Sequence, residues 1–188
     1  MSILNFKASL LGGGARANQF RVTLNFPTFV SGGSAAGNKA QFLVEAASLP
    51  GQNIGVATVM YRGRQVKLAG ERTFDNWTVS VLNDNDFDIR NAFESWMQNI
   101  NNKEQNTGII NPLQYTVDMN VEQLDRNGTS LKKYTFKDAW PVNVSPINLG
   151  FGDNDTVEKF TVDFAIGWFE AENGTAATVT ISTPLGTF

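Results

Sequence analysis

The 188-residue chain contains no cysteine and no histidine. Without cysteine, a disulfide framework and thiolate metal ligands are excluded. Histidine is the commonest general base and the commonest metal ligand near neutral pH. Its absence therefore excludes Ser–His–Asp and Cys–His catalytic arrangements and the usual zinc sites. The composition favours a protein that is not an enzyme and that holds no cofactor or metal.

Charged side chains are also sparse, because they make up 18% of the residues, and the formal net charge is −3. A charge-poor surface is typical of a protein that is partly covered by a partner. The acidic balance argues against a dedicated nucleic-acid binder, which normally carries a basic field. The start of the chain shows no secretory signal, and no run of about 18 apolar residues occurs. We therefore expect a cytoplasmic location and no membrane partner.

The remaining sequence patterns do not complete a catalytic or ligand-binding motif. The run from Asp84 to Asp88 begins like a calcium loop, but positions six and twelve of that loop fall on Ile89 and Ser95 instead of Gly and Glu. A capped helix start is the favoured interpretation. Two glycine-rich segments, 12–14 and 149–152, lack the flanking strand or helix of a phosphate or dinucleotide loop.

Three carboxylates leave an enzymatic alternative open. They are predicted to lie on strands, on the faces opposite the apolar residues, and could meet as a glycosidase pair would. A solvated sheet face is the simpler interpretation, since no aromatic-rich cleft accompanies them. These carboxylates are Asp118, Glu122 and Asp163.

Alternation of apolar and polar residues is the dominant pattern of the chain. Phe20, Val22, Leu24 and Phe26 alternate with polar residues, and a period of two predicts a half-buried strand. Glycine-containing turns are predicted between several of the segments. The same analysis predicts strands or extended segments at 42–47, 52–70, 77–81, 115–122, 131–136, 160–168 and 178–182.

One segment has helical periodicity, over residues 86–100. Ile89, Phe93 and Trp96 form an apolar stripe, and Asp86 is the expected N-cap. Residues 31–38 are rich in Gly, Ser and Ala and are predicted to form a flexible loop. Many strands with one helix predict a mainly β fold, an antiparallel sandwich or barrel with the helix packed at one end.

The chain is predicted to have three parts. An N-terminal arm covers residues 1–18, a β domain covers 19–170, and a C-terminal extension covers 171–188. Within the domain, residues 50–74 are expected to form an extended arm.

Residues 61–84 resemble the signature of the major tail tube proteins of T-even-type contractile-tailed phages. The most specific part is Ala69-Gly70-Glu71-Arg72-Thr73-Phe74-Asp75-Asn76-Trp77-Thr78-Val79. Segments 18–22, 47–50, 139–144 and 158–162 fit the same pattern. The likeness therefore covers most of residues 18–170.

The resemblance implies a tube. In that family, six subunits form a ring whose sheets join into a continuous β-barrel, and rings stack into a tube inside a contractile sheath. The tube fold is shared with type VI secretion. The implied partners are other copies of the chain, the tail sheath protein, baseplate and tail terminator proteins, the tape measure protein and, transiently, DNA in the lumen. The implied location is the virion, after assembly in the host cytoplasm.

Two alternatives to this function stay open. The first is the inner tube of a phage-derived contractile injection particle or bacteriocin, which the sequence does not separate from a phage tail. The second is a monomeric β-sandwich binding module, which predicts a stable monomer with exposed aromatic residues.

Two sets of residues are candidates for sites of assembly. The extended arm carries a basic run that we expect to contact neighbouring subunits, although a nucleic-acid patch is the alternative interpretation. A second set lies in the polar phase of long strands, and some of its members are expected to face the lumen. The basic run is Arg62, Arg64, Lys67 and Arg72, and the lumen candidates are Thr116, Asp118, Glu122, Thr161 and Asp163.

Overall fold

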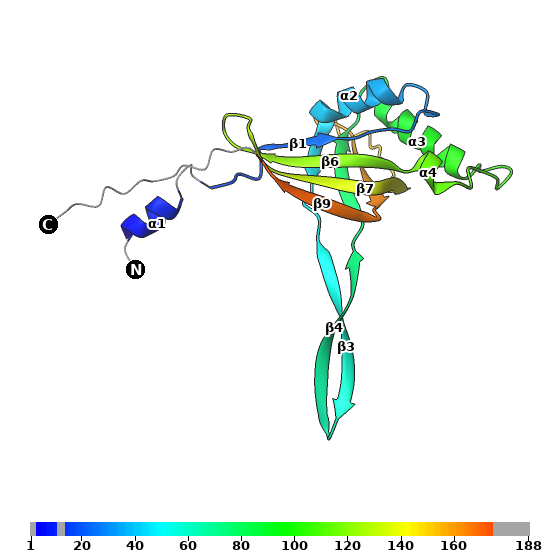
Figure 1. Ribbon diagram of the computed structural model, residues 1–188. Helices are drawn as coiled ribbons and strands as arrows, with labels where there is room; N and C mark the ends of the chain where they lie inside the picture. The colour runs from blue at the N-terminus through cyan, green and yellow to red at the C-terminus, as the bar shows by residue number, and fades with distance from the viewer. Residues whose placement is uncertain (1–2, 11–13, 175–188) are drawn as a thin grey trace.

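The computed structural model describes residues 3–10 and 14–174, and it consists of a β domain from which a long hairpin projects (Figure 1). In chain order the elements are α1 (Ile3–Ser9), β1 (Phe20–Thr23), α2 (Gly33–Leu43), β2 (Val44–Ala47), β3 (Gln52–Tyr61), β4 (Arg64–Phe74), β5 (Trp77–Leu82), α3 (Asp88–Ile100), α4 (Pro112–Tyr115), β6 (Val117–Leu124), β7 (Ser130–Val144), β8 (Lys159–Ala165) and β9 (Trp168–Asn173).

Strand β7 holds the domain together. The domain sheet has the strand order β1-β6-β7-β8-β5-β2, and β9 also pairs with β7. The first part of β7 pairs with β6 and β9, and its last part pairs with β8. We call β1-β6-β7-β9 the front layer and β7-β8-β5-β2 the back layer. All pairings are antiparallel, which confirms the predicted mainly β fold class.

A bulge marks the place where β7 passes from one layer to the other. The pairing with β6 shifts register between Val117 and Met119, and opposite this shift Asp138 adopts a left-handed backbone with φ 55°. Bulges bend a strand and increase its twist. Gly167 lies against the bulge and donates its N–H to the carbonyl of Lys137 at 3.0 Å. A Cβ at Gly167 would approach Asp138 to 3.3 Å, so a larger residue there would require Asp138 to shift slightly.

This arrangement corrects the strand predicted at 160–168. The apolar alternation continues through Ile166 to Trp168, but the chain leaves the back layer at Ala165 and enters the front layer at Trp168. Periodicity does not reveal this change of layer, because Ile166 and Trp168 continue the apolar phase of β8 in the sequence. In the structure Trp168 is 44% exposed, and Phe169 is the residue of β9 that packs on the core.

Large aromatic residues fill the space between the layers. The Trp77 ring of the back layer stacks on Phe136 of the front layer, with ring centroids 4.3 Å apart. Phe93 and Trp96 of α3 are fully buried, and Phe93 also contacts Phe164. The apolar stripe predicted for this helix therefore faces the core, where such rings supply most of the buried apolar area.

Helix α2 corrects the prediction of a loop at 31–38 and of a strand that begins at residue 42. Its buried face consists of Gly33, Ala36, Gly37 and Ala40. A Cβ at Gly37 would lie 2.7 Å from the carbonyl oxygen of Leu24, so glycine lets the helix lie directly against that backbone. A Gly- and Ala-rich composition is typical of loops, but here it provides a smooth surface for close packing.

The helix content is accordingly higher than the single helix predicted. Short helices α1 and α4 also occur, and the predicted strand at 42–47 is reduced to Val44–Ala47. The strand predicted at 178–182 lies outside the described residues. Within the described ranges, no helix is long and apolar enough to cross a bilayer.

The aromatic stack between the layers should dominate the stability of the domain. We expect Phe136→Ala to lower the free energy of unfolding by about 3–5 kcal/mol, because it leaves a cavity beneath Trp77. Phe42→Ala is the matched control, since that ring is 86% exposed, and it should change stability by less than about 0.5 kcal/mol. Urea denaturation followed by tryptophan fluorescence measures both. Equal effects of the two substitutions would contradict the role given to the stack.

Candidate assembly surfaces

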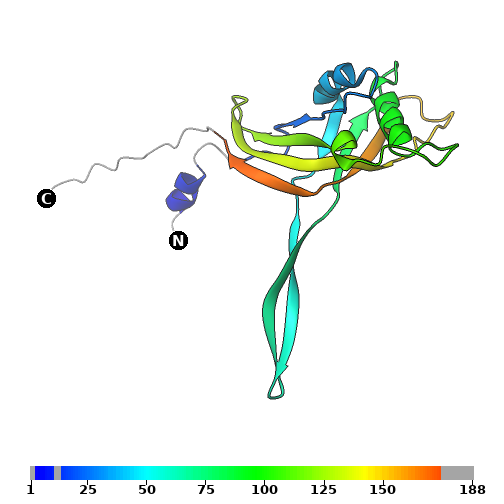
Figure 2. The ribbon, with the colours of Figure 1, turned by 45° about the vertical axis from the view of Figure 1, so that its right-hand side comes forward.

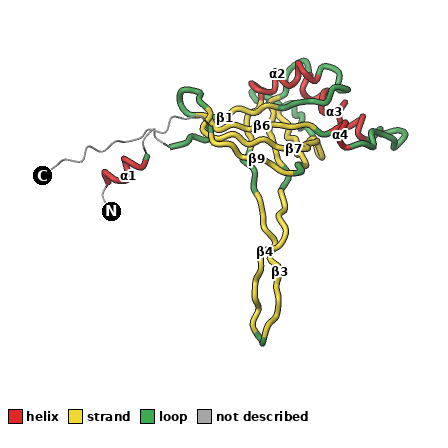
Figure 3. Tube along the Cα trace, viewed as in Figure 1, coloured by secondary structure: helices red, strands yellow, loops and turns green. Residues whose placement is uncertain are grey.

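The first candidate surface is the arm, the hairpin formed by β3 and β4, which extends away from the domain (Figures 1 and 3). Every residue of β3 is exposed, and so is every residue of β4 except Phe74 at its base. An isolated two-stranded hairpin is only marginally stable in water. The arm therefore leaves almost its whole surface available for contact with another protein surface.

The outer half of the arm has one apolar face. Cross-strand partners share a face of a hairpin, and here Val59 pairs with Val66 and Ala57 pairs with Leu68. The opposite face is mixed, since it carries pairs such as Thr58 with Lys67. The apolar face is the one suited to burial against a partner.

The four basic residues predicted to contact other subunits all lie on the arm, but they do not form one patch. Arg62 occupies the turn, and its guanidinium lies 5.5 Å from the centre of the Tyr61 ring. Arg64 shares the apolar face, Lys67 lies on the mixed face, and Arg72 near the base donates to the Gln52 side chain at 3.2 Å. The tip therefore combines two arginines with apolar side chains.

Two of the five lumen candidates lie on the outer face of the front layer. Asp118 accepts a hydrogen bond from Lys137 Nζ at 2.6 Å, and a Glu122 carboxylate oxygen lies 4.0 Å from a guanidinium nitrogen of Arg21. Lys133 pairs with Glu122 across the strands. The charges of this face thus alternate in sign from strand to strand.

Two other candidates lie on the outer face of the back layer. Asp163 accepts hydrogen bonds from Thr78 Oγ1 at 2.6 Å and from Asn143 Nδ2 at 3.0 Å, and these bonds lower the pKa of its carboxyl group. Thr161 lies on the same face, and its backbone N–H donates to Ser145 Oγ at 2.8 Å. The fifth candidate, Thr116, lies between α4 and β6, and its hydroxyl donates to the Pro112 carbonyl. The five candidates therefore do not share one surface.

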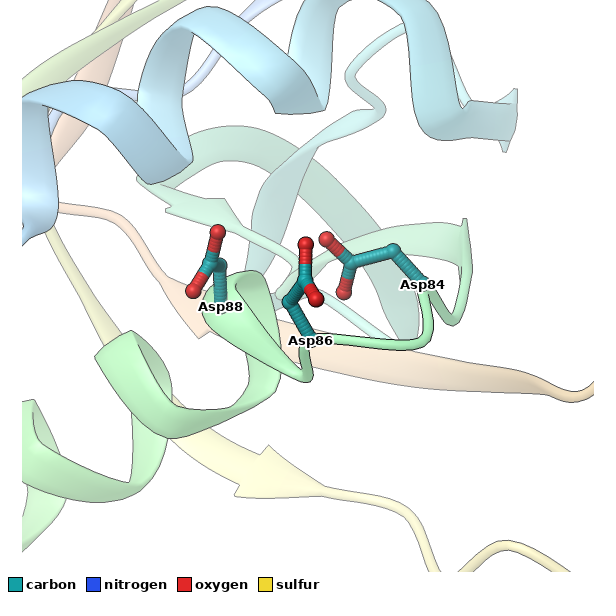
Figure 4. Close-up of side chains that lie close together, drawn as sticks. All are labelled: Asp84, Asp86 and Asp88. Atoms are coloured by element: carbon teal, nitrogen blue, oxygen red, sulfur yellow. The ribbon is translucent and has the colours of Figure 1, made fainter.

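Three aspartates, Asp84, Asp86 and Asp88, lie close together at the start of α3 (Figure 4), and they surround one lysine of α2. Lys39 Nζ of α2 lies 3.0 Å from an Asp84 oxygen and 3.3 Å from an Asp86 oxygen, and it also pairs with Asp88. These three carboxylates have the spacing of a metal site, but the ammonium group occupies the space between them. The hydrogen bond that Lys39 Nζ donates to the Asp88 carboxylate makes the largest contribution to raising the pKa of Lys39 above its ordinary value.

This cluster corrects the predicted helix cap. Asp86 does not cap α3, because the preceding residue is Phe87 in a left-handed conformation, with φ 56°, and its side chain makes no capping bond. The negative charges instead bind α2 to the start of α3. Lys39 was not identified from the sequence, because the helix that carries it, α2, was not predicted.

A mainly β domain of layered antiparallel strands with a projecting arm, whose edge strands have no strand partner on their outer sides among the described residues, is the fold class of this chain. Among solved structures, the fold is similar to a chain of the anti-feeding prophage baseplate, with TM-score 0.61 and 13% identity over 85% of this chain and 96% of that chain. It is also similar to a chain of the sheath/tube terminator of the PVC extracellular contractile injection system, with TM-score 0.55 and 15% identity over 85% and 96%. At these identities the likeness concerns the fold.

The chain belongs to the phage tail tube protein family, whose model matches residues 15–170. It is 31% identical to the tail tube protein of Serratia phage KSP90 over 160 residues, which cover 85% of this chain and 89% of the relative. It is 29% identical to tail tube protein gp19 of Enterobacteria phage T4 over 157 residues, 83% of this chain and 91% of the relative. The family resemblance at residues 61–84 is thereby confirmed, and the chain is a structural component of the virion.

Removing the positive charge of Lys39 from the aspartate cluster should destabilise the domain. A raised pKa means that the ion pairs of Lys39 contribute stability below the ordinary value of 10.5 and lose it as the pH rises through the folded value. We expect Lys39→Met to lower the free energy of unfolding between about pH 6 and 9, where a lysine side chain is protonated in both the folded and the unfolded chain. Lys39→Arg, the charge-conserving control, should lose less. Urea denaturation of both proteins measures the difference, and equal stability of Lys39→Met and the parent would contradict the role assigned to Lys39.

Proposed function

We propose that this protein is the non-catalytic subunit of the inner tube of a contractile phage tail, and that six copies form a ring which stacks on other rings. The observation that supports the proposal is that the edge strands of both layers lack a second pairing partner among the described strands. Strands β1 and β9 end the front layer, β2 ends the back layer, and no described strand pairs with their outer sides. Unpaired edges are a hazard for a monomer, and closing a ring satisfies them.

The outer face of the back layer is our candidate for the lumen. The arm continues β2 and β5 beyond the domain, so it shares their direction (Figure 1). If these strands run along the tube, the arm reaches the neighbouring ring. Thr161 and Asp163 then face the lumen, while Asp118 and Glu122 face away from it. Of the five candidates drawn from the sequence, this choice keeps Thr161 and Asp163.

The chemistry of that face supports the choice. The side chains beside Asp163 are small and mostly uncharged, since Ser80 pairs with Thr161 and Thr78 with Asp163. A basic lining would attract phosphates in a salt-dependent way. A neutral to acidic lining lets DNA slide, which a conduit for genome ejection needs.

The other partners follow from the same proposal. They are the sheath outside the tube, the baseplate and terminator at its ends, and the tape measure protein and then DNA inside it. The similar chains come from a baseplate and from a sheath/tube terminator, which supports contacts of this kind. The inner tube of a phage-derived injection particle is the second candidate, supported by the likeness to the anti-feeding prophage. Capsid and terminase genes beside the coding gene would favour the phage tail.

Negative-stain microscopy of the purified protein tests the proposed assembly. We expect rings or stacked tubes at high concentration, and faster growth when isolated baseplates supply a template. A monodisperse monomer with and without baseplates would contradict the proposal.

The arginines at the tip of the arm should be required for assembly. We expect Arg62→Glu combined with Arg64→Glu to prevent tube formation, because the reversed charges meet like charges on the neighbouring subunit. The thermal unfolding midpoint should stay unchanged, since both residues are exposed. Lys103→Glu combined with Arg126→Glu is the matched control, as both of these residues are exposed outside the arm. Normal tubes from the arm variant would show that the tip makes no essential contact.

Lysines on the lumen face should make the tube retain DNA. We expect tubes of Thr161→Lys combined with Asp163→Lys to co-sediment with linear DNA at low salt and to release it as the salt concentration rises. Asp118→Lys combined with Glu122→Lys is the comparison on the front layer and should leave the lumen unchanged. DNA held inside tubes by the front-layer variant, and not by the back-layer variant, would reverse our assignment of the lumen.

A further inference from the structure

The long connection between β7 and β8, residues 145–158, has a fixed base. Ser145 Oγ accepts a hydrogen bond from the Thr161 N–H at 2.8 Å, and Arg90 donates to the Ser145 carbonyl at 3.2 Å. At the other end, Asn83 donates from its side chain to the Glu158 carboxylate and from its backbone to the Glu158 carbonyl. Long connections without regular structure in a compact domain are usually functional. The hydrogen bonds at both ends hold the connection in place, so its tip is a candidate functional surface.

The tip carries apolar side chains that nothing in the described part of the chain covers. Phe151 is fully exposed, at 109%, and Leu149 is 80% exposed. Exposed aromatic and apolar residues gathered in one loop mark a site of interaction. Asp153 and Asp155 follow them in the chain and are also exposed, and residues 145–158 include no basic residue. We call residues 149–157 the acidic loop.

The arm has the complementary character. It carries four basic residues and one acidic residue, Glu71, between positions 52 and 74. The apolar pair of Val59 and Val66 lies next to Arg64 on the apolar face of the arm. An apolar surface with arginines at its rim matches an apolar loop with aspartates at its rim, because opposite charges guide the encounter while the apolar side chains lose contact with water.

The two surfaces do not meet within one copy of the chain. The arm extends away from the domain, while the acidic loop is attached beside α3, through the contact of Arg90 with Ser145 (Figures 1 and 2). Contact between them therefore requires a second copy.

We propose that the acidic loop is the docking site for the arm of a neighbouring copy, an inference that rests on the proposed self-assembly. Phe151 and Leu149 pack on the apolar face around Val59 and Val66. Asp153 and Asp155 pair with Arg62 and Arg64 at the tip. A protein of different sequence bound to the loop, such as a sheath subunit, is the alternative that the tests distinguish.

Charge exchange between the arm and the loop is the first test. Asp153→Lys with Asp155→Lys should raise the protein concentration needed for tube growth by about tenfold or more, as loss of central interface contacts does. Adding Arg62→Glu and Arg64→Glu to the same chain should restore growth, because the opposite signs face each other again. Glu104→Lys is a control at an exposed position outside the loop. Failure of the exchanged chain to recover, with each pair defective alone and the fold intact, would overturn the pairing.

Cross-linking tests the contact directly, since the chain has no cysteine of its own. An Arg64→Cys protein is mixed with an Asp153→Cys protein and oxidised during assembly. We expect a disulfide-linked dimer of the two chains, and little of it when Glu104→Cys replaces Asp153→Cys. Equal yields from both mixtures would overturn the proposed contact.

Phe151→Ser distinguishes the loss of the loop contact from a general effect on folding. The side chain touches nothing in the described domain, so the thermal midpoint should stay the same while tube growth weakens. Normal tubes from Phe151→Ser, without a cross-link between arm and loop, would leave the proposed function standing and remove this inference. Absence of any oligomer of the parent protein would remove the proposed function itself.

Discussion

The sharing of β7 between two layers is the constraint on which the rest of the structure depends. Because one strand serves both layers, the sheet folds over on itself and encloses the stack of Trp77 and Phe136. Among the described residues the layers do not close into a barrel, since β2 does not pair with β1 or β9. In the part of the chain that the structure describes, the front layer ends at β1 and β9 and the back layer ends at β2, which leaves backbone donors and acceptors at these edges without a strand partner. The ring that we propose would satisfy these edges with strands of neighbouring copies.

Much of the fold can be predicted from the sequence, because period-two alternation records burial residue by residue. The helix predicted over 86–100 and observed over Asp88–Ile100 is visible from its apolar stripe, and the arm is visible as an extended segment. Helix α2 could not be predicted, because its small residues are explained by close packing against the backbone of Leu24, which lies in another segment of the chain. The break at Gly167 is equally hidden, because the bulge at Asp138 that requires it lies in another strand.

The candidate sites were predicted less completely, for a related reason. Alternation tells which residues of a strand point away from the core, but it does not tell to which layer the strand belongs. Asp118 and Asp163 have the same polar phase, yet they lie on opposite layers. The basic residues of the arm were found as a run in the sequence. Their division between two faces follows from the cross-strand register of Val59 with Val66, which depends on the turn and the bulge of the hairpin.

Charge on the arm can serve two purposes at once. An exposed hairpin with an apolar face could pair with the arm of another free subunit, and such pairing would compete with ordered growth. Arg62 and Arg64 at every tip make that approach unfavourable, because like charges repel in the encounter of two arms. An acidic apolar surface does not meet this repulsion. The same two arginines therefore oppose the contact between arms and favour docking on a loop that carries Asp153 and Asp155, so the selection of the correct neighbour requires no additional element of the fold.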